Sequence, residues 1–414
     1  MAKTTKTVRK GFSYLSCDDF AAYLNHMARL GWHFTGWRAG LVFEKGEPEN
    51  AVYAVEVFNK QDESDTRPLP ETREFAEYCE AAGWQFVDAS RKFTVFKRIR
   101  EDAVPILTDE ERFEAISRAS GQSVWRWLGI SLAWSIMQLL EFRSGFKYSI
   151  FRNRELIVAG TWFLLFILAA ARALQFLLWK RRCVRRMDQG LTLFFGRDAS
   201  DKWDSWLYLS ILGFQTVSLA YIGEGWISLI ILGMAAALVL MGFLIARFRP
   251  DATVSAIIQT LGGFAIFIAA LTAFTITGQS EKLQDLATVE PPVVYAEIWE
   301  NPGEPEDVYS KRYESVFGSW NICSLDYGDA ELYYEVFRSD YTWVLDEVWR
   351  GILKGRATRE GTDCTELWDA EVAILSTANY YKVRCENTIL DIHCDRHPLT
   401  EADIAAIIEA FGLR

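Results

Sequence analysis

A cluster of histidine, cysteine and aspartate residues lies near the C-terminus of this 414-residue chain. His393, Cys394, Asp395 and His397 all carry side chains that can ligate a transition metal. They follow an apolar run from Ile389 that predicts a β-strand, and neighbouring strand residues point to opposite faces. His393 and Cys394 could bind one ion only if the strand had already ended, so we expect neither a metal site nor a cofactor here.

Four of the seven cysteines lie in the C-terminal part of the chain: Cys323, Cys364, Cys385 and Cys394. In an oxidising compartment they could form two disulfides, in any of three connectivities. Cys385 and Cys394 flank a predicted hairpin and could be cross-strand neighbours. We therefore expect at least one disulfide, which would typically add about 2–4 kcal/mol of stability.

Catalytic motifs do not stand out anywhere in the sequence. There is no Ser-His-Asp set, no paired-carboxylate signature, no P-loop and no glycine-rich dinucleotide motif. His26 and His33 have no cysteine or carboxylate at metal-ligand spacing. The sequence therefore predicts a protein that is not an enzyme, although a site combining Glu224 with the loop 141–155 would escape this reasoning.

Five apolar stretches occupy the middle of the chain. They run roughly over residues 124–140, 156–179, 206–222, 226–246 and 255–276. About 20 helical residues cross a hydrocarbon core about 30 Å thick, so the second, fourth and fifth are long enough, whereas the first and third are marginal. Because the number is odd, we expect the N-terminal and C-terminal domains on opposite sides of a membrane.

Basic residues predict the orientation of these spans. Five cations follow the second span: Lys180, Arg181, Arg182, Arg185 and Arg186. The positive-inside rule places this end, and with it the N-terminus, in the cytoplasm. The loop 141–155 also carries cations and argues against this orientation. We interpret the cations that follow the second span as contacts for lipid headgroups. Direct nucleic-acid binding is not expected, because stacking aromatics are not interleaved with them.

The N-terminal region contains an internal repeat. Residues 23–45 align with residues 75–97 at a constant spacing of 52, with Gly31-Trp32 falling on Gly83-Trp84. Each copy is expected to form a strand (8–14 and 52–58), an amphipathic helix that stops at the glycine, and a two-stranded hairpin. Two such βαββ units predict an α+β domain with helices on one face of the sheet.

The same region resembles a bacterial family of uncharacterised membrane proteins, known by a domain of unknown function with the number 2812. The resemblance rests on residues 9–12 (RKGF), 23–32 (YLNHMARLGW), 73–78 (REFAEY) and 83–84 (GW), and Tyr23 replaces a tryptophan of the family motif. The resemblance implies that a PadR-type transcriptional regulator is often encoded beside such proteins and is a candidate partner. It supplies no catalytic residues.

The C-terminal region is acidic, with 27 acidic and 12 basic residues from position 279 onward. We expect strands over 309–325, 330–337, 366–375, 380–384 and 389–394, and helices over 341–354 and 401–411. Thr400 would cap the last helix and Gly412 would end it. This pattern predicts a second small α+β domain that stands off an anionic membrane surface.

The chain is thus expected to have five parts. These are a cytoplasmic domain of two βαββ units (1–100), a linker helix (101–123), a transmembrane region of five helices (124–278), a stalk (279–305) and an extracytoplasmic α+β domain (306–414). The sequence favours a non-enzymatic regulatory or sensory membrane protein that couples the outer domain to a cytoplasmic protein partner. The alternative is a transporter or transporter accessory subunit, which would need polar groups at mid-depth, where Arg172 is the one charge.

Overall fold

The computed structural model describes residues 4–196, 200–221, 225–278, 306–328, 331–394 and 399–413. The chain is a mixed α+β protein that divides into two compact units. One unit comprises Met1–Trp134 and Phe163–Thr277, and the other comprises Ser135–Trp162 and Gly278–Arg414. The expected stalk, residues 279–305, lies outside the described residues.

The N-terminal domain of the first unit contains two three-stranded antiparallel sheets, with strand orders β1-β3-β2 and β4-β6-β5. Its elements are β1 (Thr5–Val8), α1 (Cys17–Arg29), β2 (Trp32–Trp37), β3 (Leu41–Lys45), β4 (Tyr53–Val57), α2 (Pro70–Ala81), β5 (Trp84–Ser90) and β6 (Phe93–Arg98). The strand expected over 8–14 is wrong: β1 is Thr5–Val8 and shares only Val8 with it, and a 3-10 turn at Tyr14–Ser16 leads into α1.

Special backbone conformations recur in this domain at the spacing of 52 residues. Gly31 and Gly83 follow the two helices with φ values of 76° and 94°, a left-handed conformation that costs glycine least. Ala39 and Arg91 occupy the hairpin turns with φ values of 54° and 52°. The register also shifts at matching places, between Phe34 and Gly36 in β2 and between Phe86 and Asp88 in β5.

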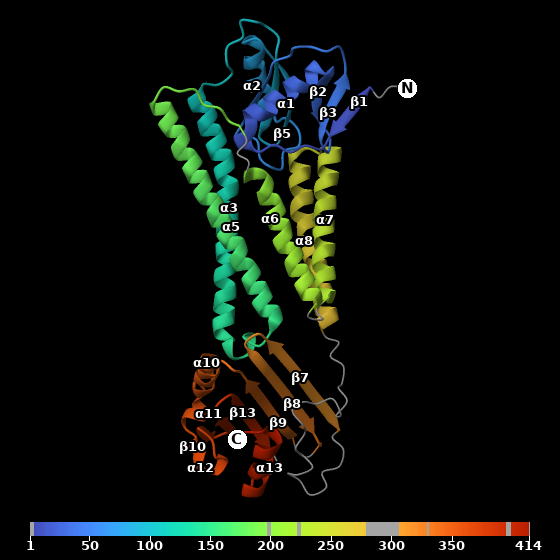
Figure 1. Ribbon diagram of the computed structural model, residues 1–414. Coiled ribbons are helices and arrows are strands. Elements are labelled where there is room, and N and C mark those ends of the chain that lie inside the picture. The colour runs from blue at the N-terminus through green and yellow to red at the C-terminus, as the bar shows by residue number, and fades with distance from the viewer. Residues whose placement is uncertain are drawn as a thin grey trace. The chain divides into compact units, whose positions relative to one another are not determined.

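Long helices form the rest of the first unit (Figure 1), and two of them, α3 and α5, have one end in the second unit. They are α3 (Asp109–Ser144), α5 (Asn153–Asp188), α6 (Ser200–Tyr221), α7 (Gly225–Phe248) and α8 (Ala252–Gly278). Among the described residues, three helical segments are long and apolar enough to cross a membrane: Asn153–Asp188, Trp226–Phe248 and Ala252–Ala273. The protein is therefore suited to a membrane, and the crossing of α3 and α6 stays a prediction.

From Asp109 onward, the expected linker helix and the first expected span form one uninterrupted helix, whereas residues 101–108 of the expected linker helix are not helical. Thr108 caps α3 through a capping box, in which its Oγ1 accepts from the backbone N–H of Glu111 (3.3 Å) and its own N–H donates to Glu111 Oε2 (2.8 Å). The helix then continues without a break to Ser144. The helical part of the linker is therefore a rigid extension of the helix that follows it.

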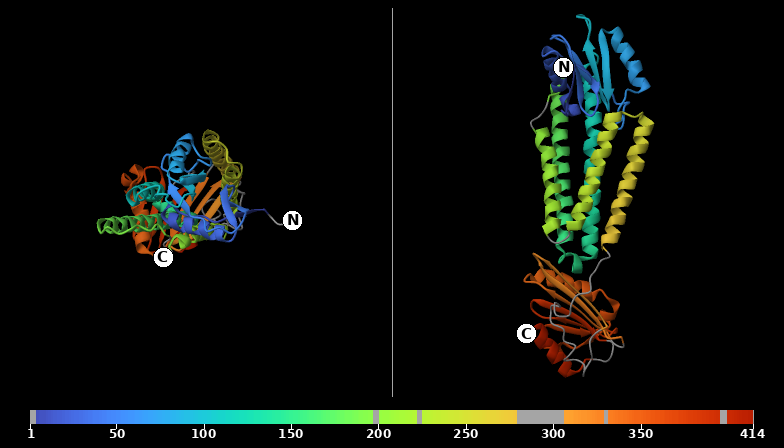
Figure 2. Two further views of the ribbon diagram at one scale, coloured as in Figure 1. Left: turned by 90° about the horizontal axis from the view of Figure 1, so that it is seen from above. Right: turned by 90° about the vertical axis from the view of Figure 1, so that its right-hand side faces the viewer.

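The second unit is built on a seven-stranded antiparallel sheet in the order β10-β11-β12-β13-β9-β8-β7. Figure 2 shows strands of this unit in orange. Its elements are α4 (Phe146–Ser149), β7 (Asp307–Ser315), β8 (Gly318–Asp326), β9 (Glu331–Arg338), α10 (Thr342–Leu353), α11 (Arg356–Arg359), β10 (Thr362–Asp363), α12 (Thr365–Trp368), β11 (Val372–Leu375), β12 (Tyr380–Arg384), β13 (Thr388–Cys394) and α13 (Glu401–Phe411).

Helices cover both faces of this sheet. One core contains residues of α13 such as Ile404 and Phe411 together with Leu390 and Ile392 of β13. The other contains residues of α10 together with Ile389 of the same strand. Alternate residues of β13 therefore enter opposite cores, as the period of two in a strand requires.

Two expectations for this domain are wrong. The region expected as one strand over 309–325 is the hairpin of β7 and β8, which turns at residues 316–317 just before Gly318, whose φ is 139°. A Cβ there would lie 2.1 Å from Arg338 O. Residues 366–375 are not one strand either, because α12 buries Trp368 and β11 begins only at Val372. The last helix begins after Thr400 and ends before Gly412, as expected.

Candidate functional site

Arg249 joins the turn between α7 and α8 to the N-terminal domain. Its φ is 48°, a left-handed conformation that costs a non-glycine residue about 1–2 kcal/mol. Its Nη1 donates to Asp88 Oδ2 (2.7 Å) and Trp37 O (3.2 Å). Its Nη2 donates to Asp88 Oδ1 (3.1 Å) and Ala89 O (2.7 Å), and its Nε donates to Thr66 O. All the N–H donors that a guanidinium offers are thus used.

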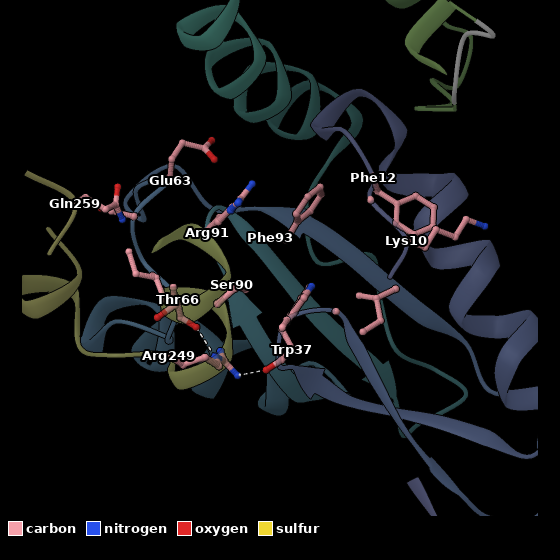
Figure 3. Close-up of a pocket in the computed structure, with 18 of the residues that line it drawn as sticks. Lys10, Phe12, Trp37, Glu63, Thr66, Ser90, Arg91, Phe93, Arg249 and Gln259 are labelled. Carbon is pink, nitrogen blue, oxygen red and sulfur yellow. Dashed lines mark hydrogen bonds between the residues drawn. The ribbon is translucent and has the colours of Figure 1, made fainter. Parts of the chain in front are cut away.

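We call this set of contacts the Arg249 clamp. It is largely buried, because the side chains of Arg249 and Asp88 are 19% and 12% exposed. The pairing is bidentate, a geometry that suits the planar fork of arginine and that lysine cannot reproduce. Figure 3 shows the guanidinium between Thr66 and Trp37, which come from different parts of the domain.

The clamp lies where the two three-stranded sheets of the domain meet. Asp88 of β5 accepts hydrogen bonds from the N–H of Trp37 in β2 (3.0 Å) and from the N–H of Ala89 (2.9 Å). Gly36 has a φ of 147°, and a Cβ added to it would lie 2.4 Å from Asp88 Oδ2. Gly36 and Asp88 occupy matching positions at the spacing of 52, so only a residue without a side chain at the first position leaves room for the carboxylate at the second.

Further hydrogen bonds extend the contact between the α7–α8 turn and the domain. The N–H of Ala39 donates to Ala246 O (3.0 Å). Thr66 Oγ1 donates to Pro250 O (3.0 Å), and Ser255 Oγ donates to Ser64 O (2.9 Å). The hairpin turn at Ala39 and the loop before α2 therefore both hold the ends of α7 and α8.

A cavity of about 410 Å³ lies beside the clamp (Figure 3). Its polar wall includes Lys10, Glu63, Arg91 and Gln259. Its apolar wall comes from the domain and from the end of α7: Phe12, Phe20, Trp37, Phe93, Leu238, Met241 and Ile245. The described lining offers no cysteine, serine–histidine pair or carboxylate pair.

A second charged contact joins the domain to α3 and to the segment after α5. Arg112 of α3 pairs with Asp18 (2.7 Å) and with Glu56 (3.0 Å). Asp18 Oδ2 accepts from the N–H of Phe195 (2.7 Å), whose side chain is fully buried. Asp109 Oδ2 accepts from the N–H of Leu193 (3.0 Å). The domain is therefore bonded to α3 and to the α5–α6 connection as well as to α7 and α8.

Burial shifts the pKa values of the charged groups in this second contact. Burial raises the pKa of Glu56 to about 7, because the loss of water outweighs the attraction of Arg112. Burial opposes the charged form of Arg112 too, but the two carboxylates beside it raise its pKa above the ordinary value. Two acids share one cation here, so the group that can take up a proton near neutral pH is Glu56.

In the second unit, the connection between α3 and α5 is bonded to the C-terminal sheet. Lys147 of α4 pairs with Glu335 of β9 (3.2 Å), and Glu335 is 3% exposed. Lys382 and Asp391 form an adjacent pair across β12 and β13. Burial opposes the charge on Lys147, but Glu335 raises the pKa of the ammonium. Burial lowers the pKa of Lys382 despite Asp391.

Apolar and aromatic contacts reinforce this connection. Ile150 and Phe151 are buried in the core that also contains α10. Asn153 Nδ2 donates to Glu314 O (2.8 Å). Arg152 pairs with Glu155 (3.0 Å) and lies over the ring of Trp320. The cation-bearing loop 141–155 is therefore partly packed into the C-terminal domain.

The structure holds all seven cysteines as free thiols. Cys385 faces Thr388 across the hairpin, whereas Cys394 lies beyond the pair of Tyr380 with His393. The two cysteines are at opposite ends of the hairpin, about 20 Å apart at about 3.3 Å per residue. They are not the expected cross-strand neighbours, and with Cys323 and Cys364 they form no disulfide.

The histidine and cysteine cluster near the C-terminus is only partly visible. His393 Nδ1 donates to Asn379 O (2.9 Å), and its ring stacks on Tyr380. Cys394 is buried in the core on the α13 side of the sheet. Asp395 and His397 lie outside the described residues, as does Glu224. Within the described parts of the chain, no three His, Cys, Asp or Glu side chains are grouped so that they could hold a metal ion.

The cations expected at lipid headgroups lie on the last turns of α5. Lys180, Arg181, Arg182, Arg185 and Arg186 are exposed, whereas Cys183 between them packs into the core of the N-terminal domain. Their contact with lipid stays a prediction. Arg172 lines a cavity of about 480 Å³ with Arg126, Gln175 and residues of the N-terminal domain such as Tyr14.

With this geometry described, the comparison with protein families can be stated. Residues 16–128 match a family model described as protein of unknown function (DUF2812). The match covers the N-terminal domain and the start of α3, and it agrees with the resemblance seen in the sequence motifs. Comparison with the curated proteins and with the solved structures gave no match.

The Arg249 clamp was not anticipated from the sequence. One signal was present, because the spacing of 52 places an aspartate at 88 opposite a glycine at 36. A charged residue that breaks a repeat next to a glycine indicates a special contact, but its partner, 161 positions away in the chain, could not be derived.

Proposed function

We propose that this chain is a non-enzymatic regulatory or sensory membrane protein. It couples an extracytoplasmic C-terminal domain to a cytoplasmic N-terminal domain that binds a protein partner. The observation that carries this proposal is the Arg249 clamp, in which every guanidinium donor at the end of α7 is bonded to the N-terminal domain. A displacement of α7 would move the seam between β2 and β5, and a partner bound to the domain would sense it.

The proposed topology has five membrane crossings, with the N-terminus in the cytoplasm. Two cations of the 141–155 loop, which argue against this orientation, are paired with carboxylates and therefore add less to the charge bias of their side. Lys147 is paired with Glu335, and Arg152 is paired with Glu155. The cations on the last turns of α5 are exposed, so they keep the charge bias that favours a cytoplasmic face.

The proposed cytoplasmic partner is a protein. We propose that the N-terminal domain is a duplicated βαββ unit whose exposed surface binds it, and the family resemblance suggests a PadR-type regulator. The recurrence of the strand order and of the left-handed residues at a spacing of 52 supports the duplication.

The test uses the full-length protein in its native membrane. Photo-crosslinking from exposed positions of the N-terminal domain, such as Lys60 and Tyr78, should trap one defined cytoplasmic protein. Arg249→Gly should change the yield of that product, while Arg98→Gln, a change at an exposed arginine outside the clamp, should not. Recovery of lipid and chaperones alone would remove the regulatory proposal.

The topology is tested separately with cysteines placed at exposed sites, because the native thiols are buried or half-buried. A membrane-impermeant thiol reagent applied to intact cells should label Lys354→Cys and spare Lys60→Cys. The opposite pattern would overturn the orientation.

The transporter alternative would require polar side chains that line a path through the bilayer. Arg172 and Gln175 line one cavity and Gln259 lines another, and both cavities also contain residues of the N-terminal domain. This arrangement supports a binding site at one end of the helices better than a path at mid-depth, so we retain the regulatory proposal.

A further inference from the structure

Four arginines line an open cavity of about 440 Å³ next to the Arg249 clamp. Arg38 follows β2 and Arg67 lies in the loop before α2, whereas Arg247 and Arg249 come from the end of α7. Pro68 and Phe248 complete the lining, which contains no acidic residue. We call this cavity the arginine pocket.

The arginine pocket has positive charge that its surroundings do not neutralise. Arg249 is paired with Asp88. Arg67 pairs with Asp251 at 2.9 Å, but both side chains are more than half exposed, so water weakens that pair. Arg38 and Arg247 are exposed and have no ionic partner among the residues that the structure describes. Two guanidinium groups, one next to β2 and one from α7, are thus available for an anion.

The pocket also lies at the end of an apolar helix. Phe248 is 69% exposed and is the last residue of the segment Trp226–Phe248, which is long and apolar enough to cross a membrane. Exposed Leu240, Phe243 and Leu244 lie on the preceding turns of α7. If α7 crosses the bilayer, the pocket stands at the headgroup layer, with a lipid-facing apolar surface directly beside it.

We propose that the arginine pocket binds the phosphate group of an anionic phospholipid. Arginine pairs with phosphate in a bidentate manner, and basic pockets at the cytoplasmic ends of membrane helices suit anionic headgroups. The phosphate bridges Arg38 and Arg67 of the N-terminal domain to Arg247 of α7, and the acyl chains lie along the exposed side chains of α7. A bound lipid therefore strengthens the docking of the domain on the membrane helices. The inference needs α7 to cross the membrane but does not need the regulatory role.

The experiment uses full-length protein that has been delipidated in a neutral detergent. Phosphatidylglycerol and phosphatidylcholine in mixed micelles, and inorganic phosphate in water, are added separately. Bound lipid is counted by native mass spectrometry, and the thermal unfolding midpoint is followed by tryptophan fluorescence. The test variant is Arg38→Gln/Arg247→Gln. The matched control is Arg29→Gln/Arg98→Gln, which removes two exposed cations of the N-terminal domain outside the pocket.

The wild type and the control should retain phosphatidylglycerol in preference to phosphatidylcholine and unfold at a higher temperature with it. The test variant should bind phosphatidylglycerol about tenfold more weakly or worse, because it loses charge-assisted hydrogen bonds to the phosphate. Equal binding by the test variant and the control would overturn the site. Equal binding of the two lipids would overturn its preference for anions. Stabilisation by inorganic phosphate alone, lost in the test variant, would assign the pocket to a soluble phosphate and overturn the lipid.

Discussion

Replacing Arg249 should release the N-terminal domain from the end of α7 without unfolding the domain. Breaking a buried ion pair by removing one partner costs roughly 3–5 kcal/mol, because the other charge stays buried without compensation. Asp88 is 12% exposed, so some water reaches it and the lower part of that range applies. We expect Arg249→Ala to destabilise the docked state by about 3 kcal/mol. Arg249→Gly should cost about 1 kcal/mol less, because glycine adopts the φ of 48° without strain.

The assay is hydrogen exchange of the full-length protein. The amide of Ala39 donates to Ala246 O, and it therefore reports the opening of the joint directly. Amides of the β4–β6 ladder, such as that of Val55, report the unfolding of the domain itself. Arg249→Gly should speed exchange at Ala39 by about thirtyfold, which corresponds to about 2 kcal/mol, and leave Val55 protected.

A double-mutant cycle decides whether the ion pair carries this effect. Asp88→Asn keeps the shape of the side chain and an oxygen that accepts hydrogen bonds, but it removes the charge. If the pair is coupled, the double variant should be less destabilised than the sum of the two single variants, by 1 kcal/mol or more, roughly. A coupling below about 0.5 kcal/mol is what independent sites show, and it would refute the clamp as the joint between the two elements.

Three further predictions concern other contacts. Gly36→Ala places a Cβ 2.4 Å from Asp88 Oδ2 and should lower stability by about 2–3 kcal/mol in thermal unfolding, whereas Gly11→Ala, with open space around it, should have little effect. The pKa of Glu56 is raised from 4.5 to about 7 in the folded chain, so its stabilising contribution is complete below pH 4.5 and is lost as the pH rises through 7. The unfolding midpoint of the wild type should therefore fall across this range, and Glu56→Gln should flatten the profile; equal slopes would contradict the burial argument. Lys147→Met leaves Glu335 buried and unpaired and should speed proteolysis of the C-terminal unit, and adding Glu335→Gln should restore resistance. Failure of the second change to rescue would show that the pair does not hold α4 on the sheet.

The sequence determined those features that depend on neighbouring residues. The spacing of apolar residues and the glycine stops predicted the two helices of the N-terminal domain, because amphipathic periodicity and left-handed glycines act within a few residues. The capping threonine and the final glycine predicted the bounds of the last helix for the same reason. Length and hydropathy predicted the three helices that are apolar enough to cross a membrane.

Local patterns failed where a distant contact decides the conformation. The run 309–325 has the composition of one strand, but β7 and β8 pair with each other, and Arg338 O lies too close to Gly318 for a side chain there. Cys385 and Cys394 are close in sequence, but the register of β12 on β13 places them at opposite ends of the hairpin.

The contacts of the candidate site also depend on residues that are distant in the chain. Nothing near Arg249 in the chain indicates Asp88, and nothing near Lys147 indicates Glu335, because each pair joins segments more than 150 residues apart. The amphipathic helices and the apolar stretches could be predicted from the sequence, since they depend on forces between near neighbours. Which charges lose their water and find partners could be read only from the folded chain, since burial is a property of the packed chain.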